Sequence, residues 1–252
     1  IVKDDCHALL CQLKILVGVF PVAAHAYNQS VYHKLLHHVQ IVVFPICILV
    51  AFRQQHFLVS IIQDFLYAAD YLPQVLVDDN NDSFFMVEHL IRQGRKRIAY
   101  IQGPDDIYNT YLREQGYREA MEKFKLYDPA LIVRTGMTFK DGADAIDRLI
   151  SKGVDFDAVY AFTDTLAIGA MNRLRDLGKR VPDDVSVAGF SGTELSTIVS
   201  PQLTTMEPPL AEMGRKAAEM VMEKIKNPEM ENRKVVLKTI MRKRMSTGEK
   251  ED

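Results

Sequence analysis

Residues 75–245 of this 252-residue chain predict an α/β fold built on a parallel β-sheet. Short apolar runs alternate with longer segments whose apolar residues recur at helical spacing, and glycine or proline ends several of them. Strands that alternate with helices of this length are typical of a parallel sheet covered by helices on both faces. The first 74 residues do not follow this pattern.

Seven segments have the apolar content expected of strands. In chain order they are Val75–Val77, Arg97–Gln102, Leu131–Val133, Ala158–Phe162, Val185–Phe190, Leu203–Met206 and Val235–Ile240. The second, RIAYIQ, and the fifth, VSVAGF, are nearly continuous apolar runs of the kind that parallel sheets bury on both faces. Gly103-Pro104 ends the second strand, because neither residue continues a ladder well.

Five segments between these strands show helical periodicity. They are Ser83–Gln93, Asn109–Lys125, Asp141–Lys152, Thr165–Leu177 and Leu210–Lys226. In the first, Phe84, Val87 and Leu90 recur at three-residue spacing and share one face. Gly94 ends that helix, and Gly153, Gly178 and Pro228 follow the third, fourth and fifth.

The composition indicates a globular protein that does not bind DNA by charge alone. Apolar residues make up 48% and charged residues 25%, with a net charge of −2 and an isoelectric point near 6.4. A domain that grips DNA by itself usually has a basic excess. Cys6, Cys11 and Cys47 lack the paired spacing of metal sites, and Ile41–Phe52 is too short to span a bilayer. We therefore expect a cytoplasmic protein with no cofactor, no metal and no membrane contact.

Residues 1–74 differ in composition from the remainder. They contain only eight of the chain's charged side chains, no glutamate precedes Glu88, and Gly18 is the only glycine before Gly94. Two interpretations stay open: a lobe covered by a partner, or a shifted reading frame, which the composition favours. His33 and His37 share one helical face, a spacing that metal sites use, but no third ligand accompanies them. Uncoordinated histidines are the favoured interpretation.

Polar or small residues follow several predicted strands. They lie at 103–109, 136–139, 163–164 and 189–193. In open parallel sheets, ligands bind beyond the carboxyl ends of the strands, where these loops would converge. The sequence therefore predicts a cleft for a small polar ligand at this edge.

Four ordered segments resemble the LacI/GalR (lactose-repressor and galactose-repressor) family of bacterial transcription regulators. They are Glu88–Gly103 (EHLIRQGRKRIAYIQG), Arg113–Tyr117 (REQGY), Ala161–Met171 (AFTDTLAIGAM) and Val181–Pro208 (VPDDVSVAGFSGTELSTIVSPQLTTMEP). They occur in the family's order between residues 88 and 208. Each segment alone is a weak signal, whereas the ordered set is specific.

The resemblance implies a periplasmic-binding-protein type I-like core with two lobes, each a parallel sheet flanked by helices. It also implies a small-molecule effector between the lobes, a homodimer, and operator DNA bound only through an N-terminal helix-turn-helix domain missing from this chain. Residues 1–74 would stand unmatched in the place of the N-terminal lobe, and 75–207 would form the C-terminal lobe. Residues 208–245 would supply a cross-over helix and the last strands, followed by a tail at 246–252.

The resemblance also assigns ligand-binding positions. Arg113 matches the family's effector-binding arginine, and its guanidinium offers a fork of donors for a hydroxyl pair or a carboxylate. Asn109 matches a ligand-contacting position one helical turn earlier, on the same face. The alternative for Arg113 is a solvated arginine. If the ligand role holds, Arg113→Ala should abolish effector binding with the fold intact.

Four further residues are candidates for the same site. Asp164 matches a family aspartate that accepts ligand hydroxyls, although it would equally suit the N-cap of the following helix. Thr163 stands where relatives often have asparagine, and Thr138 lies near a position often occupied by a stacking aromatic. Ser191 replaces the aspartate usual in sugar-binding members, which leaves the identity of the ligand open.

Other functional classes have less support. Gly189–Thr193 lacks the final glycine of a nucleophile elbow, His89 is the only histidine after residue 74, and no phosphate-binding loop occurs. We therefore expect no catalytic residues and no enzyme. A periplasmic sugar receptor for transport or chemotaxis shares the core fold and remains an alternative. A truncated or misread product without function is another.

Overall fold

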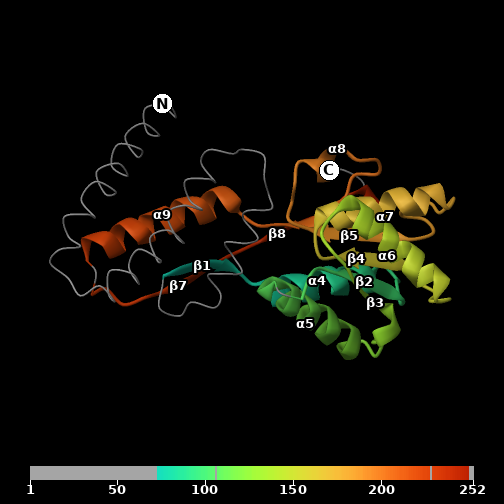
Figure 1. The fold of residues 1–252 in the computed structure, drawn as a ribbon, viewed down its shortest axis with the longest axis horizontal. Helices are drawn as coiled ribbons and strands as arrows, with labels where there is room; N and C mark the ends of the chain where they lie inside the picture. The colour runs from blue at the N-terminus through green and yellow to red at the C-terminus, as the bar shows by residue number, and fades with distance from the viewer. Residues whose placement is uncertain (1–72, 106, 228, 250–252) are drawn as a thin grey trace. The chain divides into compact units, whose positions relative to one another are not determined.

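The computed structural model describes residues 73–105, 107–227 and 229–249 (Figure 1). The described residues all fall in one compact unit of the chain. The predictions made for 1–72, including His33, His37 and Ile41–Phe52, lie outside the described residues. Among the helices that are described, none is both long and apolar enough to cross a membrane.

A six-stranded sheet forms the centre of the larger described region. Its strands follow the order β3-β2-β4-β5-β6-β8. Their bounds are β2 Ile98–Gln102, β3 Ile132–Arg134, β4 Ala158–Ala161, β5 Ser186–Phe190, β6 Thr204–Glu207 and β8 Ile240–Arg242. The first five in sheet order are parallel, and β8 pairs antiparallel with β6. The predicted parallel α/β sheet is confirmed, with one antiparallel strand added at its edge.

Helices cover both faces of this sheet, as predicted from the alternation. α4 (Asp79–Arg92) and α5 (Tyr108–Lys123) lie on one side, and α6 (Phe139–Ser151) and α7 (Asp164–Asp176) lie on the other (Figure 1). Gly116 brings α5 close to α4, because a Cβ at this position would lie 2.1 Å from the backbone oxygen of Asn80. The helical turn α8 (Leu195–Ile198) and the 3-10 turns η1 (Pro129–Leu131) and η2 (Met245–Thr247) complete the region.

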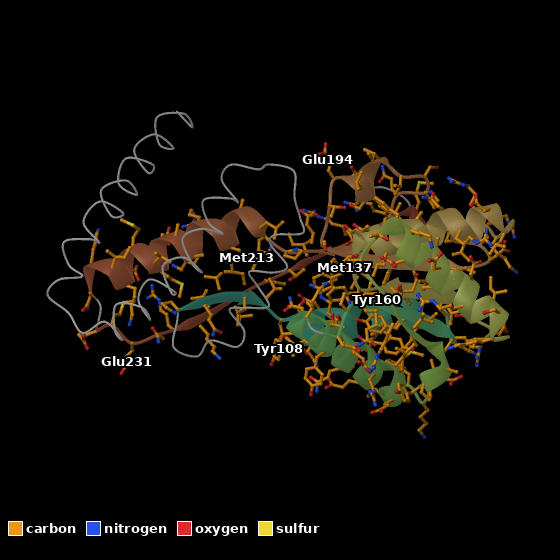
Figure 2. The ribbon with its side chains drawn as sticks, in the orientation of Figure 1. Tyr108, Met137, Tyr160, Glu194, Met213 and Glu231 are labelled. Carbon is orange, nitrogen blue, oxygen red and sulfur yellow. The ribbon has the colours of Figure 1, made fainter. Side chains whose placement is uncertain are left out.

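Aromatic side chains fill the layer between the sheet and α4–α5. The Tyr100 ring stacks on Tyr117 and Tyr160, with centroids 5.0 and 5.3 Å apart. The Tyr160 hydroxyl shares a buried 2.6 Å hydrogen bond with Ser83, and Tyr117 donates to the carbonyl of Ile98 over 2.8 Å. Figure 2 labels Tyr160 among these side chains. Two of the three buried hydroxyls thus have partners, which offsets the cost of removing them from water.

A separate two-stranded sheet joins distant parts of the chain. β1 (Gln74–Val77) pairs in parallel with β7 (Lys234–Leu237), and α9 (Leu210–Lys226) contacts β1. Four residues, Val75, Val77, Met213 and Met220, form its buried cluster. Figure 2 labels Met213 on α9.

Several predicted boundaries differ from the structure. The single strand predicted at Val235–Ile240 is two strands, β7 and β8, which belong to different sheets. The domain boundaries predicted between 75–207 and 208–245 do not follow the sheets. β1, from the first of these ranges, pairs in the two-stranded sheet, and β8, from the second, pairs in the six-stranded sheet. The tail predicted from residue 246 begins inside η2, where buried Ser246 donates to the Val187 carbonyl over 2.6 Å.

The first helix also begins earlier than predicted. α4 starts at Asp79 instead of Ser83, because the Asp78 carboxylate caps the helix by accepting from the Asn81 N–H over 3.1 Å. Apolar periodicity does not detect this polar first turn, although aspartate is a favoured N-cap residue.

Candidate functional site

The carboxyl ends of β2 to β6 lie along one edge of the six-stranded sheet. Parallel pairing with β2, β4 and β5 fixes this arrangement. Contacts between the strand ends confirm the predicted convergence of loops. A Cβ on Gly103, after β2, would lie 2.4 Å from the Phe162 ring after β4, and the Ser191 N–H after β5 donates to the Met206 carbonyl over 2.9 Å.

Arg113 is buried at this edge and is not a solvated side chain. It projects from α5, and 7% of its side chain is exposed. Its Nε donates to Asp79 Oδ1 over 2.6 Å, and its Nη1 donates to the Phe162 carbonyl, also over 2.6 Å. The guanidinium therefore links the first turn of α4 to the end of β4.

Two aromatic rings hold the Arg113 guanidinium. Its central carbon lies 3.6 Å from the centroid of the Phe190 ring and 4.6 Å from that of Phe162. Stacking on aromatic faces stabilises a guanidinium, and more so where water is excluded. Among the described residues, no hydrogen bond is recorded from Nη2, so this nitrogen retains donor capacity.

Asp79 is the charged partner of Arg113 and is fully buried. Its second oxygen accepts from Asn109 Nδ2 over 3.3 Å, so both predicted α5 residues contact the same carboxylate. Burial raises the pKa of the Asp79 carboxyl, and the charge and hydrogen bond of Arg113 oppose that rise. Burial also lowers the pKa of Arg113, but Asp79 outweighs this effect and raises it above its ordinary value. The cation and its carboxylate therefore act as one unit.

A second carboxylate follows on the same helix. Burial raises the pKa of Asp82 to about 6, the neighbouring Thr239 side chain opposes the rise, and the nearby charges of Asp79 and Asp78 add to it. Its Oδ2 is buried without a hydrogen-bond partner among the described residues. The region around Arg113 thus carries more acidic than basic side chains.

Asp164 binds the loop that follows β5 and the neighbouring strand β6. It is fully buried, its Oδ2 accepts from the Thr193 N–H over 2.7 Å, and its Oδ1 accepts from the Thr205 hydroxyl over 2.5 Å. Glycine is required at Gly189, because a Cβ there would lie 2.6 Å from Asp164 Oδ1. Both carboxylate oxygens are engaged within the protein, and Asp164 fixes the loop after β5 to α7 and β6.

The N-cap prediction for Asp164 was wrong. Thr163 is the N-cap of α7, with its hydroxyl accepting from the Leu166 N–H over 3.3 Å, and Asp164 is the first helical residue. The backbone of Thr163 is extended, with φ of −137°, as is usual for an N-cap residue.

Thr138 and Ser191 lie on loops that follow strands. Thr138 is exposed and caps α6 through a capping box, in which its hydroxyl accepts from the Asp141 N–H over 3.2 Å. Ser191 is half-buried next to Phe190 and has φ of 129°, a conformation that side chains seldom adopt. Arg113 contacts Phe162 and Phe190 at the ends of β4 and β5, and Thr163 and Ser191 directly follow these two residues. Asn109 is linked to Arg113 through Asp79, whereas Thr138 contacts Asp141 within its own capping box.

Sequence reasoning missed three contributors to the site. Asp79 was overlooked because it lies before the predicted start of its helix, although three aspartates within five residues were a visible signal. Phe162 and Phe190 were counted only as the last residues of strands. Both are aromatic residues that directly precede candidate ligand contacts, and this position could have indicated their role in the site.

Comparison with known proteins identifies the family. Residues 87–247 match the periplasmic binding protein-like domain. The transcriptional repressor CytR of Escherichia coli K12, named as HTH-type, is 34% identical over 155 residues, which are 61% of this chain and 46% of CytR. The chain thus spans about half the length of the curated relatives it matches.

Two solved structures extend the likeness. The transcriptional regulator CelR in complex with cellobiose is 32% identical, with a TM-score of 0.67 over 70% of this chain and 54% of CelR. A LacI family transcriptional regulator from Enterococcus faecium with bound ribose is 25% identical, with a TM-score of 0.64 over 69% of this chain and 65% of that one. These relatives are regulators and not enzymes or transport receptors, in agreement with the expectation from the sequence. The chain belongs to the periplasmic-binding-protein-like family and carries, over part of its length, the effector-binding core of a LacI-family transcriptional regulator.

Proposed function

We propose that this core belongs to a cytoplasmic, homodimeric regulator and binds a small sugar-like effector at the sheet edge around Arg113. The six-stranded region would form most of one lobe, and α9 with the two-stranded sheet would belong to a second. Effector binding would change the DNA affinity of a helix-turn-helix domain by shifting the population between two conformations.

The observation that carries the proposal is the fixed guanidinium of Arg113. Nε and Nη1 are occupied by Asp79 and Phe162, while Nη2 has no recorded partner among the described residues. A buried donor with spare capacity suits a ligand hydroxyl, since a ligand oxygen would complete its hydrogen bonding. Phe162 and Phe190 would keep this donor in a single orientation.

The other predicted residues receive different weight in this proposal. Asn109 shares Asp79 with Arg113, and Thr163 and Ser191 directly follow the two aromatic residues that contact its guanidinium. These three residues are proposed ligand contacts, and Thr138 is retained as a further one. Asp164 is proposed to act through the Thr193 loop, because its oxygens already have partners. The relatives described with cellobiose and ribose support a sugar as the class of ligand.

Calorimetric titration of the full chain with ribose and cellobiose tests the proposal. Arg113→Lys keeps a charge beside Asp79 but removes the planar fork, so we expect affinity for the bound sugar to fall at least about tenfold. Arg118→Lys, on the exposed face of the same helix, is the matched control and should bind as the wild type does.

Circular dichroism would verify that both variants remain folded. Binding that is equal in the wild type and Arg113→Lys would contradict the site. Failure of every tested sugar to bind the folded wild-type chain would contradict the function.

A further inference from the structure

Asp79 contacts Arg113 through Nε, and Nη2 is the guanidinium nitrogen that has no hydrogen bond among the described residues. Its Oδ1 lies 2.6 Å from Nε, so the carboxylate occupies the inner edge of the guanidinium. One N–H of Nη1 donates to the Phe162 carbonyl, and the Phe190 and Phe162 rings lie against the guanidinium. Nη2 and the second N–H of Nη1 are left for an additional acceptor.

The charge of Arg113 is already cancelled in this arrangement. Asp79 is fully buried, and its recorded charge interactions are with Arg113 and Asp78. No second cation is recorded in contact with Asp79 among the described residues. A carboxylate or phosphate arriving at Nη2 would therefore meet a hydrogen-bond donor without a net positive charge.

We propose that Asp79 determines the specificity of this site by restricting the effector to uncharged polyhydroxyl compounds and excluding their carboxylated and phosphorylated counterparts. This inference rests on the proposed function. Asp79 acts as a positioning residue through Arg113, because it fixes the guanidinium and removes its attraction for anions. A buried carboxylate repels an anionic ligand, and this repulsion contributes more to specificity than to the affinity for a neutral ligand.

Titration of the full chain with matched ligands tests the proposal. The pairs are ribose against ribose 5-phosphate and glucose against glucuronate, which differ chiefly in charge. We expect the wild type to bind the neutral member at least about tenfold more tightly. Equal affinity, or a preference for the anion, would overturn the inference and leave a ligand site at Arg113 in place.

Asp79→Asn should narrow or reverse this preference. The amide oxygen can still accept from Arg113 Nε, so the geometry is kept while the charge of Arg113 is released. The matched control is Asp82→Asn, which removes an acidic group from the same helix without touching Nε, and should keep the preference of the wild type. If Asp79→Asn discriminates as strongly as the wild type, the inference fails while the proposed function stands.

Inorganic phosphate provides a readout that does not depend on a sugar. A millimolar concentration should raise the melting temperature of Asp79→Asn, in which no carboxylate offsets the charge of Arg113, and leave those of the wild type and Asp82→Asn unchanged. Equal responses of all three proteins would overturn the assignment even if a sugar binds. Should Asp79→Asn fail to fold, the ligand preference of the wild type alone decides the question.

Discussion

The six-stranded sheet buries its central strands completely, whereas only one strand of the two-stranded sheet, β1, is buried along its whole length. β2 and β5 are buried along their whole length, whereas the residues of β7 are exposed or half-buried. Beside the two-stranded sheet, Val236 is 60% and Ile225 49% exposed. Because apolar burial is the main favourable term in folding, most of the stabilising core lies in the six-stranded region.

The candidate site is built on the better buried of these regions. Arg113, Asp79, Phe162 and Phe190 all come from the six-stranded sheet or the helices that cover it. A binding side chain keeps its geometry when packed neighbours fix its rotamer. The stacked tyrosines around Tyr100 make this region of the protein well packed. The comparison therefore predicts large effects for substitutions in this region and small ones around α9.

The largest effect is expected from Arg113→Ala. Removing the guanidinium leaves the Asp79 carboxylate buried without its partner, so we expect a loss of about 3–5 kcal/mol in the free energy of unfolding, measured in urea. This differs from the expectation from sequence that the fold would be unaffected, because sequence alone did not reveal the buried partner. Arg118→Ala, which removes an exposed pair with Glu114, should cost less than about 1 kcal/mol. A similar loss of stability in both variants would show that the buried pair of Arg113 and Asp79 contributes no more than the exposed pair.

A pair of apolar truncations tests the comparison directly. Leu90 is fully buried on α4, and Leu90→Ala should cost about 2–5 kcal/mol through lost burial and the cavity that remains. Ile225→Ala on α9 should change stability by less than about 0.5 kcal/mol, because the side chain is half exposed. Urea unfolding of both variants measures the difference. A large effect at Ile225 would mean that something covers α9 in solution.

Asp82→Asn is expected to stabilise the protein, by less than Arg113→Ala destabilises it, and the gain depends on pH. The pKa of Asp82 is about 6 in the folded protein and near 3.8 when unfolded, so its ionisation disfavours the folded state. That penalty is absent below about pH 4 and complete above about pH 6. The variant should thus exceed the wild type by about 2 kcal/mol at pH 7.5, with little difference at pH 4. A gain that does not vary between these pH values would exclude this ionisation as its cause.

The sequence predicted the interior of the fold better than its edges. β2, β4 and β5 match their predicted segments to within one residue, because continuous apolar runs bounded by polar turns have no alternative placement. β7 and β8 were merged, since nothing in Val235–Ile240 marks where the chain leaves one sheet for another. The antiparallel pairing of β8 with β6 is a long-range contact that local patterns do not encode.

The candidate site was predicted in part. Arg113 was identified through the resemblance, and its burial agrees with a functional position. Its partner Asp79 was not, because pairing across 34 residues depends on how α4 and α5 meet. Gly116 allows the backbones of α4 and α5 to approach closely. This glycine belongs to the REQGY segment, but the sequence alone did not indicate its role in helix packing.

The aromatic enclosure of Arg113 has a consequence for the energetics of recognition. A long side chain in water samples many rotamers, and ordering it on ligand arrival costs about 0.5–1.5 kcal/mol. With its planar group lying against Phe190 and its two inner nitrogens already bonded, this arginine has little motion left to lose. Folding has thus already met the entropic cost of ordering this donor, and each hydrogen bond to a solute would contribute more of its strength to affinity.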